Sequence, residues 1–241
     1  MRIAVISDIH GNMEALDRVL SDIDRSDIDK IISLGDNIGY GSESDQVVHL
    51  IRKRNIESVM GNHELAVSDS SRLELFNPIA RRSLERTVEF LSDESIEFVC
   101  GLKPFLLYDG CRYVHGFPPD SIITYLFEIS FNILKRVMDR MHEAICFVGH
   151  THLLEIVCLN GSDVNRMDLS EGVTNLHQGE KYIINSGSVG QPRDGDNRAK
   201  YIIWDTADST IEVKCIAYDI ESAARKIIAA GFPKVHARRL W

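Results

Sequence analysis

The chain has 241 residues, of which 44% are hydrophobic and 26% are charged, a composition typical of a globular protein that can bury a core without disulfides. Its formal net charge of −9 disfavours binding to nucleic-acid backbones and anionic membranes, and no apolar run approaches membrane-spanning length. The five cysteines are widely spaced and form no Cys-x-x-Cys pair, which indicates reduced thiols and a cytoplasmic location.

The first 60 residues alternate between apolar runs and segments with helical periodicity. Residues 1–7, 30–34 and 56–60 are β-prone apolar runs that predict strands. Apolar residues at helical spacing predict helices over residues 12–23 and around residues 47–51. This alternation predicts a parallel sheet, and the ligand site of such a sheet lies beyond the carboxyl ends of its strands.

The middle of the chain changes to a helical pattern. Residues 64–102 predict helices, one of which is expected to bury a face formed by Ile79, Leu84, Val88 and Leu91. Residues 105–108 and 111–114 predict a hairpin around Asp109-Gly110. Residues 121–141 again have helical spacing, and we expect this helix to cover the site or a partner.

The last hundred residues are rich in β-prone runs. Strands are predicted over residues 144–148, 156–159, 182–184, 201–204 and 211–218. A final helix over residues 220–230 is followed by a basic tail that ends at Trp241. Because no repeat or linker interrupts the pattern, we expect a single domain over residues 1–241.

A polar cluster follows each of five apolar runs. The clusters are Asp8-Ile9-His10, Gly35-Asp36-Asn37, Gly61-Asn62-His63-Glu64, His115-Gly116 and Gly149-His150-Thr151-His152. Gly-Asn-His is expected only about 0.03 times by chance at this composition, whereas His-x-His is expected about 0.3 times. Taken alone, His115 is better explained as a structural histidine and Asp36 as a turn or cap residue.

The order and placement of the clusters favour a metal site, because side chains at strand ends can converge. A set of aspartate, asparagine and histidine ligands suits manganese, iron, zinc or nickel better than calcium or magnesium. Two such ions can share a water molecule and lower its pKa, and they can neutralise charge on a phosphoryl group.

These motifs, in this order, resemble the calcineurin-like metallophosphoesterase superfamily, in particular its compact bacterial and archaeal phosphodiesterase-like branch, which begins Asp-x-His-Gly-Asn. The resemblance extends from Ile3 to the glycine-rich run at residues 185–194. It implies an α/β fold, namely a four-layer α-β-β-α sandwich of two mixed β-sheets flanked by helices.

The resemblance also implies two divalent transition-metal ions, with manganese as the leading candidate and iron, zinc or nickel as alternatives. The implied ligands are Asp8, His10 and His152 for the first ion, Asn62, His115 and His150 for the second, and Asp36 as the bridge. The implied reaction is in-line attack on phosphorus by a metal-bridging hydroxide.

Three further residues are expected near the phosphate. His63 is implied to steady the transition state or to protonate the leaving oxygen. Arg193 is a predicted phosphate contact, with a surface ion pair to Asp194 or Asp196 as the alternative. Asn12 is a weaker candidate contact, because its position favours a helix N-cap.

The sequence departs from one branch of the superfamily. Protein Ser/Thr phosphatases follow the bridging aspartate with a further aspartate and an arginine, whereas Asn37-Ile38-Gly39 follows here. This departure disfavours a protein phosphatase. It leaves open whether Glu64 or another residue orients His63.

The predicted function is a dinuclear metal-dependent phosphoesterase that acts on a phosphodiester or phosphomonoester of a small molecule. A bis-nucleoside polyphosphate hydrolase is an alternative, with Tyr40, Phe117, Tyr125 and Phe127 as aromatic residues for base stacking or, more commonly, for the core. A nuclease is disfavoured by the net charge, and a non-catalytic metal-bound interaction scaffold by the presence of His63. Nothing in the sequence indicates the oligomeric state.

Overall fold

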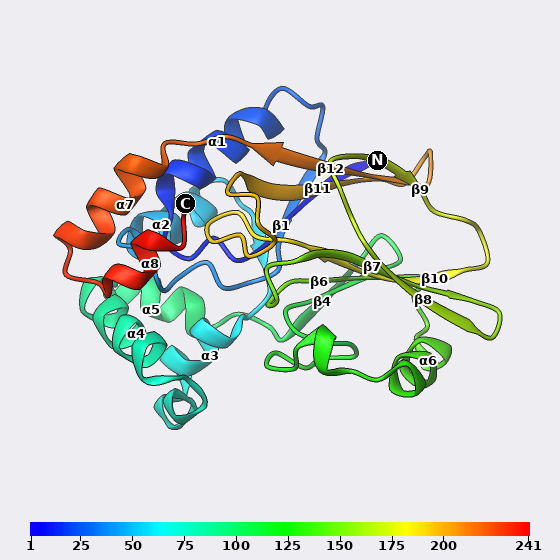
Figure 1. The fold of residues 1–241 in the computed structure, drawn as a ribbon, viewed down its shortest axis with the longest axis horizontal. Coiled ribbons are helices and arrows are strands. Elements are labelled where there is room, and N and C mark those ends of the chain that lie inside the picture. The colour runs from blue at the N-terminus through cyan, green and yellow to red at the C-terminus, as the bar shows by residue number, and fades with distance from the viewer.

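The computed structural model describes residues 1–241 and contains two six-stranded β-sheets that lie face to face, with helices on their outer sides (Figure 1). The first sheet has the order β3 (Glu57–Ser58), β2 (Lys30–Ser33), β1 (Arg2–Ile6), β11 (Ala199–Asp205), β12 (Thr210–Ile216) and β9 (Gly172–Asn175). The second has the order β4 (Phe105–Tyr108), β5 (Cys111–Val114), β6 (Ile145–Val148), β10 (Lys181–Ser186), β7 (Leu154–Asn160) and β8 (Asp163–Asp168).

Eight α-helices and two short 3₁₀ helices connect the strands. They are α1 (Met13–Ile23), α2 (Ser44–Lys53), α3 (Asn62–Ser68), η1 (Ser70–Leu75), α4 (Pro78–Phe90), α5 (Asp93–Cys100), η2 (Leu126–Glu128), α6 (Phe131–Arg140), α7 (Ile220–Ala229) and α8 (Lys234–Arg238). No helix combines the length and the apolar character needed to cross a membrane.

Both sheets are mixed. In the first sheet β1, β2 and β3 are parallel, as their alternation with helices predicted, while β11 runs antiparallel to β1. In the second sheet β5, β6 and β10 are parallel, and β4 forms the predicted antiparallel hairpin with β5. The predicted sandwich of two mixed β-sheets flanked by helices is therefore confirmed.

The largest cluster of buried side chains lies between the two sheets and contains 19 residues drawn from both. Successive residues of a strand point to opposite faces, so Ile3 and Val5 of β1 enter this central core while Ala4 and Ile6 face α1 on the outer side. On the other outer side, Leu134 of α6 packs on the second sheet. Every strand near the centre is thus buried on both faces, which explains the continuous apolar runs.

Two helix predictions were wrong. The predicted helix over residues 121–141 is limited to α6, and residues 121–130 instead form a loop that contains η2. In α4, Ile79 is 50% exposed and Val88 is 40% exposed, while the buried face includes Ala80, Ser83 and Leu84. The buried face packs partly against the C-terminal segment: Ser83 Oγ contacts His236 Nε2 at 2.6 Å, a pairing across 153 residues that helical periodicity cannot reveal.

The structure adds elements that the sequence pattern did not indicate. Residues 234–238 of the predicted basic tail form α8, and strands β8 and β9 were not predicted. All five cysteines are free thiols, as expected. The third predicted strand is also shorter than expected, because only residues 57 and 58 pair as a strand.

Candidate metal centre

Five loops bring the predicted ligands to one end of the sandwich. Asp8 and His10 follow β1, and Asp36 follows β2. Asn62 is the first residue of α3, just after β3, while His115 follows β5 and the His150-Thr151-His152 segment follows β6. All seven side chains are buried or nearly so.

Five of the seven predicted ligands have a backbone in the left-handed region, which non-glycine residues rarely adopt. They are Asp8, His10, Asp36, His150 and His152, with φ between 51° and 68°. Each such residue costs about 1–3 kcal/mol and persists only where the surrounding structure imposes it. Their concentration at one place indicates a site whose side-chain directions are set by the fold.

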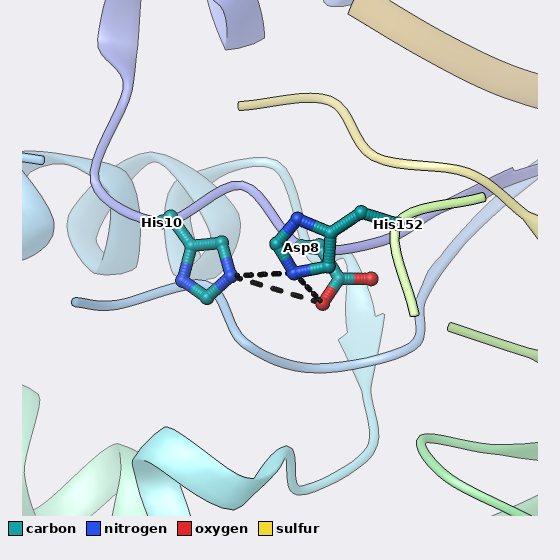
Figure 2. A group of neighbouring side chains, drawn as sticks. All are labelled: Asp8, His10 and His152. Carbon is teal, nitrogen blue, oxygen red and sulfur yellow. Dashed lines mark hydrogen bonds and ion pairs between the residues drawn. The ribbon is translucent and has the colours of Figure 1, made fainter. Parts of the chain in front are cut away.

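The first group consists of Asp8, His10 and His152, which point toward one another (Figure 2). His152 Nε2 lies 3.2 Å from Asp8 Oδ1 and 3.2 Å from His10 Nε2. Asp8 Oδ2 accepts hydrogen bonds from Ser7 Oγ and from the amide of His150. Asp8 Oδ1 is buried without a hydrogen-bond partner, so one carboxylate oxygen fixes the side chain while the other faces the two imidazoles.

The second group consists of Asp36, His115 and His150, with Asn62 beside it. His115 Nε2 lies 3.1 Å from His150 Nδ1, 3.1 Å from Asn62 Oδ1 and 3.4 Å from Asp36 Oδ2. Asp36 Oδ2 is also 3.7 Å from His10 Nε2, so this oxygen lies between the two groups. The Oδ1 atom of Asp36 accepts from the amide of His63 at 2.9 Å.

The outer nitrogens of the histidines determine which nitrogens face the centre. In His10, His115 and His152 the Nδ1 atom donates to a backbone carbonyl, those of Ile38, Leu34 and Gln191 at 3.0, 2.8 and 2.6 Å. In His150 the Nε2 atom donates to the carbonyl of Ile123 at 3.2 Å. Such outer bonds fix the tautomer and leave the inner nitrogen as a lone pair for a metal.

Two pairs of inner nitrogens therefore face each other, His10 with His152 and His115 with His150, at 3.2 and 3.1 Å. Two lone pairs at this distance repel unless a proton or a metal cation lies near both. Each pair has a carboxylate oxygen beside it, from Asp8 and Asp36 respectively. The nitrogen and oxygen donors thus fit two divalent cations.

The pKa values follow from burial and from the two carboxylates. Burial lowers the pKa of His150 to about 3, so its ring is neutral near pH 7. Burial also acts to lower the pKa of His115, but the adjacent Asp36 carboxylate outweighs it and raises that pKa to about 9. A proton on His115 and a metal ion are therefore alternative counter-charges for Asp36.

His63 lies beside this constellation and is held by packing. Its Nε2 atom is 3.9 Å from Asp36 Oδ2, and its ring has edge contacts with Tyr40 and Phe76 at centroid distances of 4.6 and 5.0 Å. His63 Nδ1 is buried without a hydrogen-bond partner. Burial lowers the pKa of His63 to about 4.

Glu64 does not orient His63. Its carboxylate accepts from the backbone amides of Asp36, Asn37 and Gly61 at 2.9, 2.7 and 2.9 Å. It therefore ties the loop after β2 to the start of α3. The sequence left open which side chain would orient His63, and in the structure its ring is held by the rings of His10, Tyr40 and Phe76 and by the close backbone of Gly39.

Arg193 and Asn12 differ in their surroundings. Arg193 has no carboxylate partner, because Asp194 pairs with Lys200 and Asp196 with Arg198, so the alternative ion pair is not formed. Asn12 accepts from the amide of Ala15 at 3.2 Å and donates to the carbonyl of Gly190 at 2.9 Å, which is the N-cap arrangement. The phosphate contact by Arg193 stays a prediction.

The four aromatic residues considered for base stacking separate into two kinds. Phe117 is buried in the cluster under α6, and Phe127 is 53% exposed. Tyr40 and Tyr125 instead line a cavity next to Asn62 and His150. Tyr125 stacks on His150 with a centroid distance of 3.9 Å.

A family model described as the calcineurin-like phosphoesterase superfamily domain matches residues 1–209. The chain belongs to this superfamily. Its members bind divalent metals, and the predicted family is thereby confirmed.

Two relatives extend the calcineurin-like phosphoesterase comparison to the whole chain. An uncharacterized protein of Methanocaldococcus jannaschii is 38% identical over 245 residues, covering 99% of this chain and 97% of its own. The crystal structure of a metallophosphoesterase from Sphaerobacter thermophilus is 35% identical, with a TM-score of 0.85 and coverage of 100% of this chain and 98% of its own. A hypothetical protein from Pyrococcus horikoshii OT3, at 17% identity, TM-score 0.81 and coverage of 100% and 97%, shares the fold.

One residue near the centre of this calcineurin-like phosphoesterase was missed. His236 of α8 is buried and stacks on Tyr40 with a centroid distance of 4.6 Å, and Tyr40 in turn contacts His10 and His63. The family match ends at residue 209, so this contact comes from a segment outside it. A histidine within a short basic tail was the only available signal, and such a histidine is commonly exposed.

Proposed function

We propose that this protein is a metal-dependent phosphoesterase that hydrolyses a phosphodiester or phosphomonoester of a small molecule. The observation that carries the proposal is the two pairs of facing imidazole nitrogens, each beside a carboxylate oxygen. Membership of the calcineurin-like phosphoesterase superfamily supports the same reaction class.

The residues divide between two cations. Asp8, His10 and His152 would hold the first, Asn62, His115 and His150 the second, and Asp36 would contact both. Two bound cations would lower the pKa of a water molecule and neutralise phosphoryl charge. The mixture of nitrogen and oxygen donors suits manganese, with iron, zinc and nickel as alternatives.

Hydrogen bonds and packing within the protein hold the candidate metal ligands and His63 in position. The outer hydrogen bonds of the four histidines hold each ring in one tautomer and one direction. His63 would stabilise the phosphoryl group in the transition state or protonate the leaving oxygen. Its packing between Tyr40 and Phe76 keeps the ring in place without a polar partner at Nδ1.

The surroundings support a small phosphorylated substrate. A net charge of −9 opposes binding of nucleic-acid backbones. The alternative of a non-catalytic scaffold has less support, because a scaffold has no need for an imidazole beside the ligand set.

The test compares the wild-type protein with His63→Ala, using 4-nitrophenyl phosphate and bis(4-nitrophenyl) phosphate after loading with manganese, iron, zinc or nickel. We expect His63→Ala to lower kcat by about 10²- to 10⁴-fold, as for the loss of a general acid, while the bound metal per chain stays unchanged. Metal content is measured by mass spectrometry of the purified proteins.

His49→Ala is the matched control, because His49 lies on α2 with a side chain that is 49% exposed. It should retain wild-type turnover. Equal residual turnover by the wild-type and His63→Ala proteins with all four metals would sink the proposal and favour the scaffold.

A further inference from the structure

A cavity opens directly beside the candidate metal centre. Asn62 and His150, both predicted ligands, form part of its lining. Its volume is about 120 Å³, whereas one water molecule takes about 30 Å³ of the liquid. The cavity therefore has room for an organic group attached to a phosphate that lies at the metal centre.

Three aromatic rings fix the shape of the cavity. Tyr125 is stacked with both His150 and Phe127, at interplanar angles of 15° and 17°, so its edge is left for the cavity. Tyr40 is stacked on His236 and contacts His10. The third ring, Phe76, is perpendicular to His63. Because their neighbours hold them, these rings form rigid walls.

The rest of the lining is mostly apolar, with Arg72 and Asn77 as its polar members. Leu75 and Ile123 are 58% and 42% exposed, although apolar side chains gain from burial. Arg72 contributes a guanidinium, whose Nε atom also pairs with Asp69 Oδ2 at 3.2 Å, and no carboxylate lines the cavity, even though the chain has 36 acidic residues. The lining offers no partner for a cationic group, and it favours an apolar group with an electron-rich face.

We propose that this cavity binds a planar aromatic group that is esterified to the substrate phosphate, such as the ring of an aryl, benzyl or nucleoside ester. The inference rests on the proposed phosphoesterase function and narrows its substrate class. The positive edges of tyrosine and phenylalanine rings attract the face of another aromatic ring, and so does the guanidinium of Arg72. A saturated ring of the same size gains neither contact.

The test uses substrates that differ only in this property. Benzyl phosphate and cyclohexylmethyl phosphate are both esters of primary alcohols, so their leaving groups have similar intrinsic reactivity. The corresponding methyl diesters test the same preference for diesterase activity. We expect kcat/KM to be about three- to tenfold higher for the benzyl esters, the range of one aromatic pair contact. Incomplete metal loading lowers kcat/KM for both esters of a pair by the same factor, so the ratio of the two kcat/KM values is unchanged.

Binding provides a second measurement that needs no turnover. Benzylphosphonate and cyclohexylmethylphosphonate have a carbon–phosphorus bond that is not hydrolysed, and their Kd values are measured by titration calorimetry. We expect the benzyl compound to bind about three- to tenfold more tightly.

Variants locate the preference within the cavity. Tyr125→Leu and Phe76→Leu each keep an apolar side chain but remove a ring, and each should reduce the benzyl preference to within about twofold. Phe131→Leu is the matched control, since Phe131 lies on α6 outside the cavity and is 57% exposed. Phe131→Leu should retain the full preference for the benzyl esters. Two cavity variants are used so that the test still stands if one of them misfolds.

The outcomes separate the two proposals. Hydrolysis of both esters with equal kcat/KM, together with equal phosphonate affinities, overturns the aromatic cavity and leaves the phosphoesterase intact. Tighter binding of benzylphosphonate without hydrolysis of any ester supports the cavity and overturns the phosphoesterase. A preference that survives in both cavity variants also overturns the assignment.

Discussion

Gly39 shows how closely the backbone approaches His63. A Cβ atom added to Gly39 would lie 2.0 Å from His63 Nδ1, and φ at this position is +93°. The glycine therefore does two things: it allows a left-handed turn and leaves space for the imidazole. Because His63 Nδ1 has no polar partner, this contact and the neighbouring rings are what hold its position.

Gly39→Ala is expected to displace the His63 ring and to lower kcat by about tenfold or more, approaching the effect of removing that imidazole. The measurement is steady-state turnover of a chromogenic phosphoester, together with urea unfolding. Gly110→Ala is the control that separates backbone strain from the clash with His63. Gly110 has φ of +72° but nothing within 4 Å of an added Cβ. It should lose about 1 kcal/mol of stability and keep its activity. Equal activities of the Gly39→Ala and Gly110→Ala proteins would show that the contact between Gly39 and His63 has no role in turnover.

At the scale of single residues, the sequence identified the candidate ligands but did not indicate the directions of their side chains. Polar residues directly after buried strands pointed to Asp8, Asp36 and His150, and the structure brings them together. The left-handed backbone and the outer hydrogen bonds of the imidazoles depend on carbonyl groups from distant loops, such as that of Gln191 for His152. No local pattern encodes those partners.

The C-terminal helix α8 connects the end of the chain to the candidate centre. His236 contacts Ser83 Oγ of α4 and stacks on Tyr40, which contacts His10 and His63. The element therefore supports one wall of the centre from behind. Its position next to α7 is visible at the end of the chain in Figure 1.

His236→Ala is expected to lower the free energy of unfolding by about 1–3 kcal/mol, because a buried ring and its hydrogen bond are lost. Amide hydrogen exchange in α8 should also become faster, which distinguishes local release of the helix from global weakening. His142→Ala, at an exposed histidine, should stay within about 0.5 kcal/mol of wild type. An unchanged exchange rate in α8 would contradict the docking role.

Helices and strands were predictable from the sequence where both of their faces are buried. They were less predictable where their packing involves the C-terminal segment. Strands β1, β2, β6 and β10 have apolar residues on both faces, and their apolar runs identified them. In α4, Ile79 was expected inside and lies outside, because α8 contacts the neighbouring face. The exposed strand β8 has no apolar run, so no sequence pattern indicated it.

At the scale of the molecule, metal binding should contribute to stability. Ligands that bind only the folded state stabilise it by about 2.7 kcal/mol at a free concentration of 100 Kd, which is roughly a 5–10 °C rise in Tm for a chain of this size. Chelation of the metal-loaded protein should reverse that rise in a scanning calorimetry experiment. Asp36→Asn should shrink the response, whereas Asp139→Asn, on the surface of α6, should keep it. A Tm insensitive to chelator would count against two ions held by buried carboxylates.

The groups that surround the centre span the chain from Asp8 to the carbonyl of Gln191. During synthesis Asp8 and His10 emerge from the ribosome long before His152 and the loop after β10. Under the proposed function, the complete ligand set would therefore form only after most of the chain has been translated. A chain that ended before that loop would lack the Gln191 carbonyl that fixes His152, and we expect it to bind the first cation less tightly even when metal is abundant.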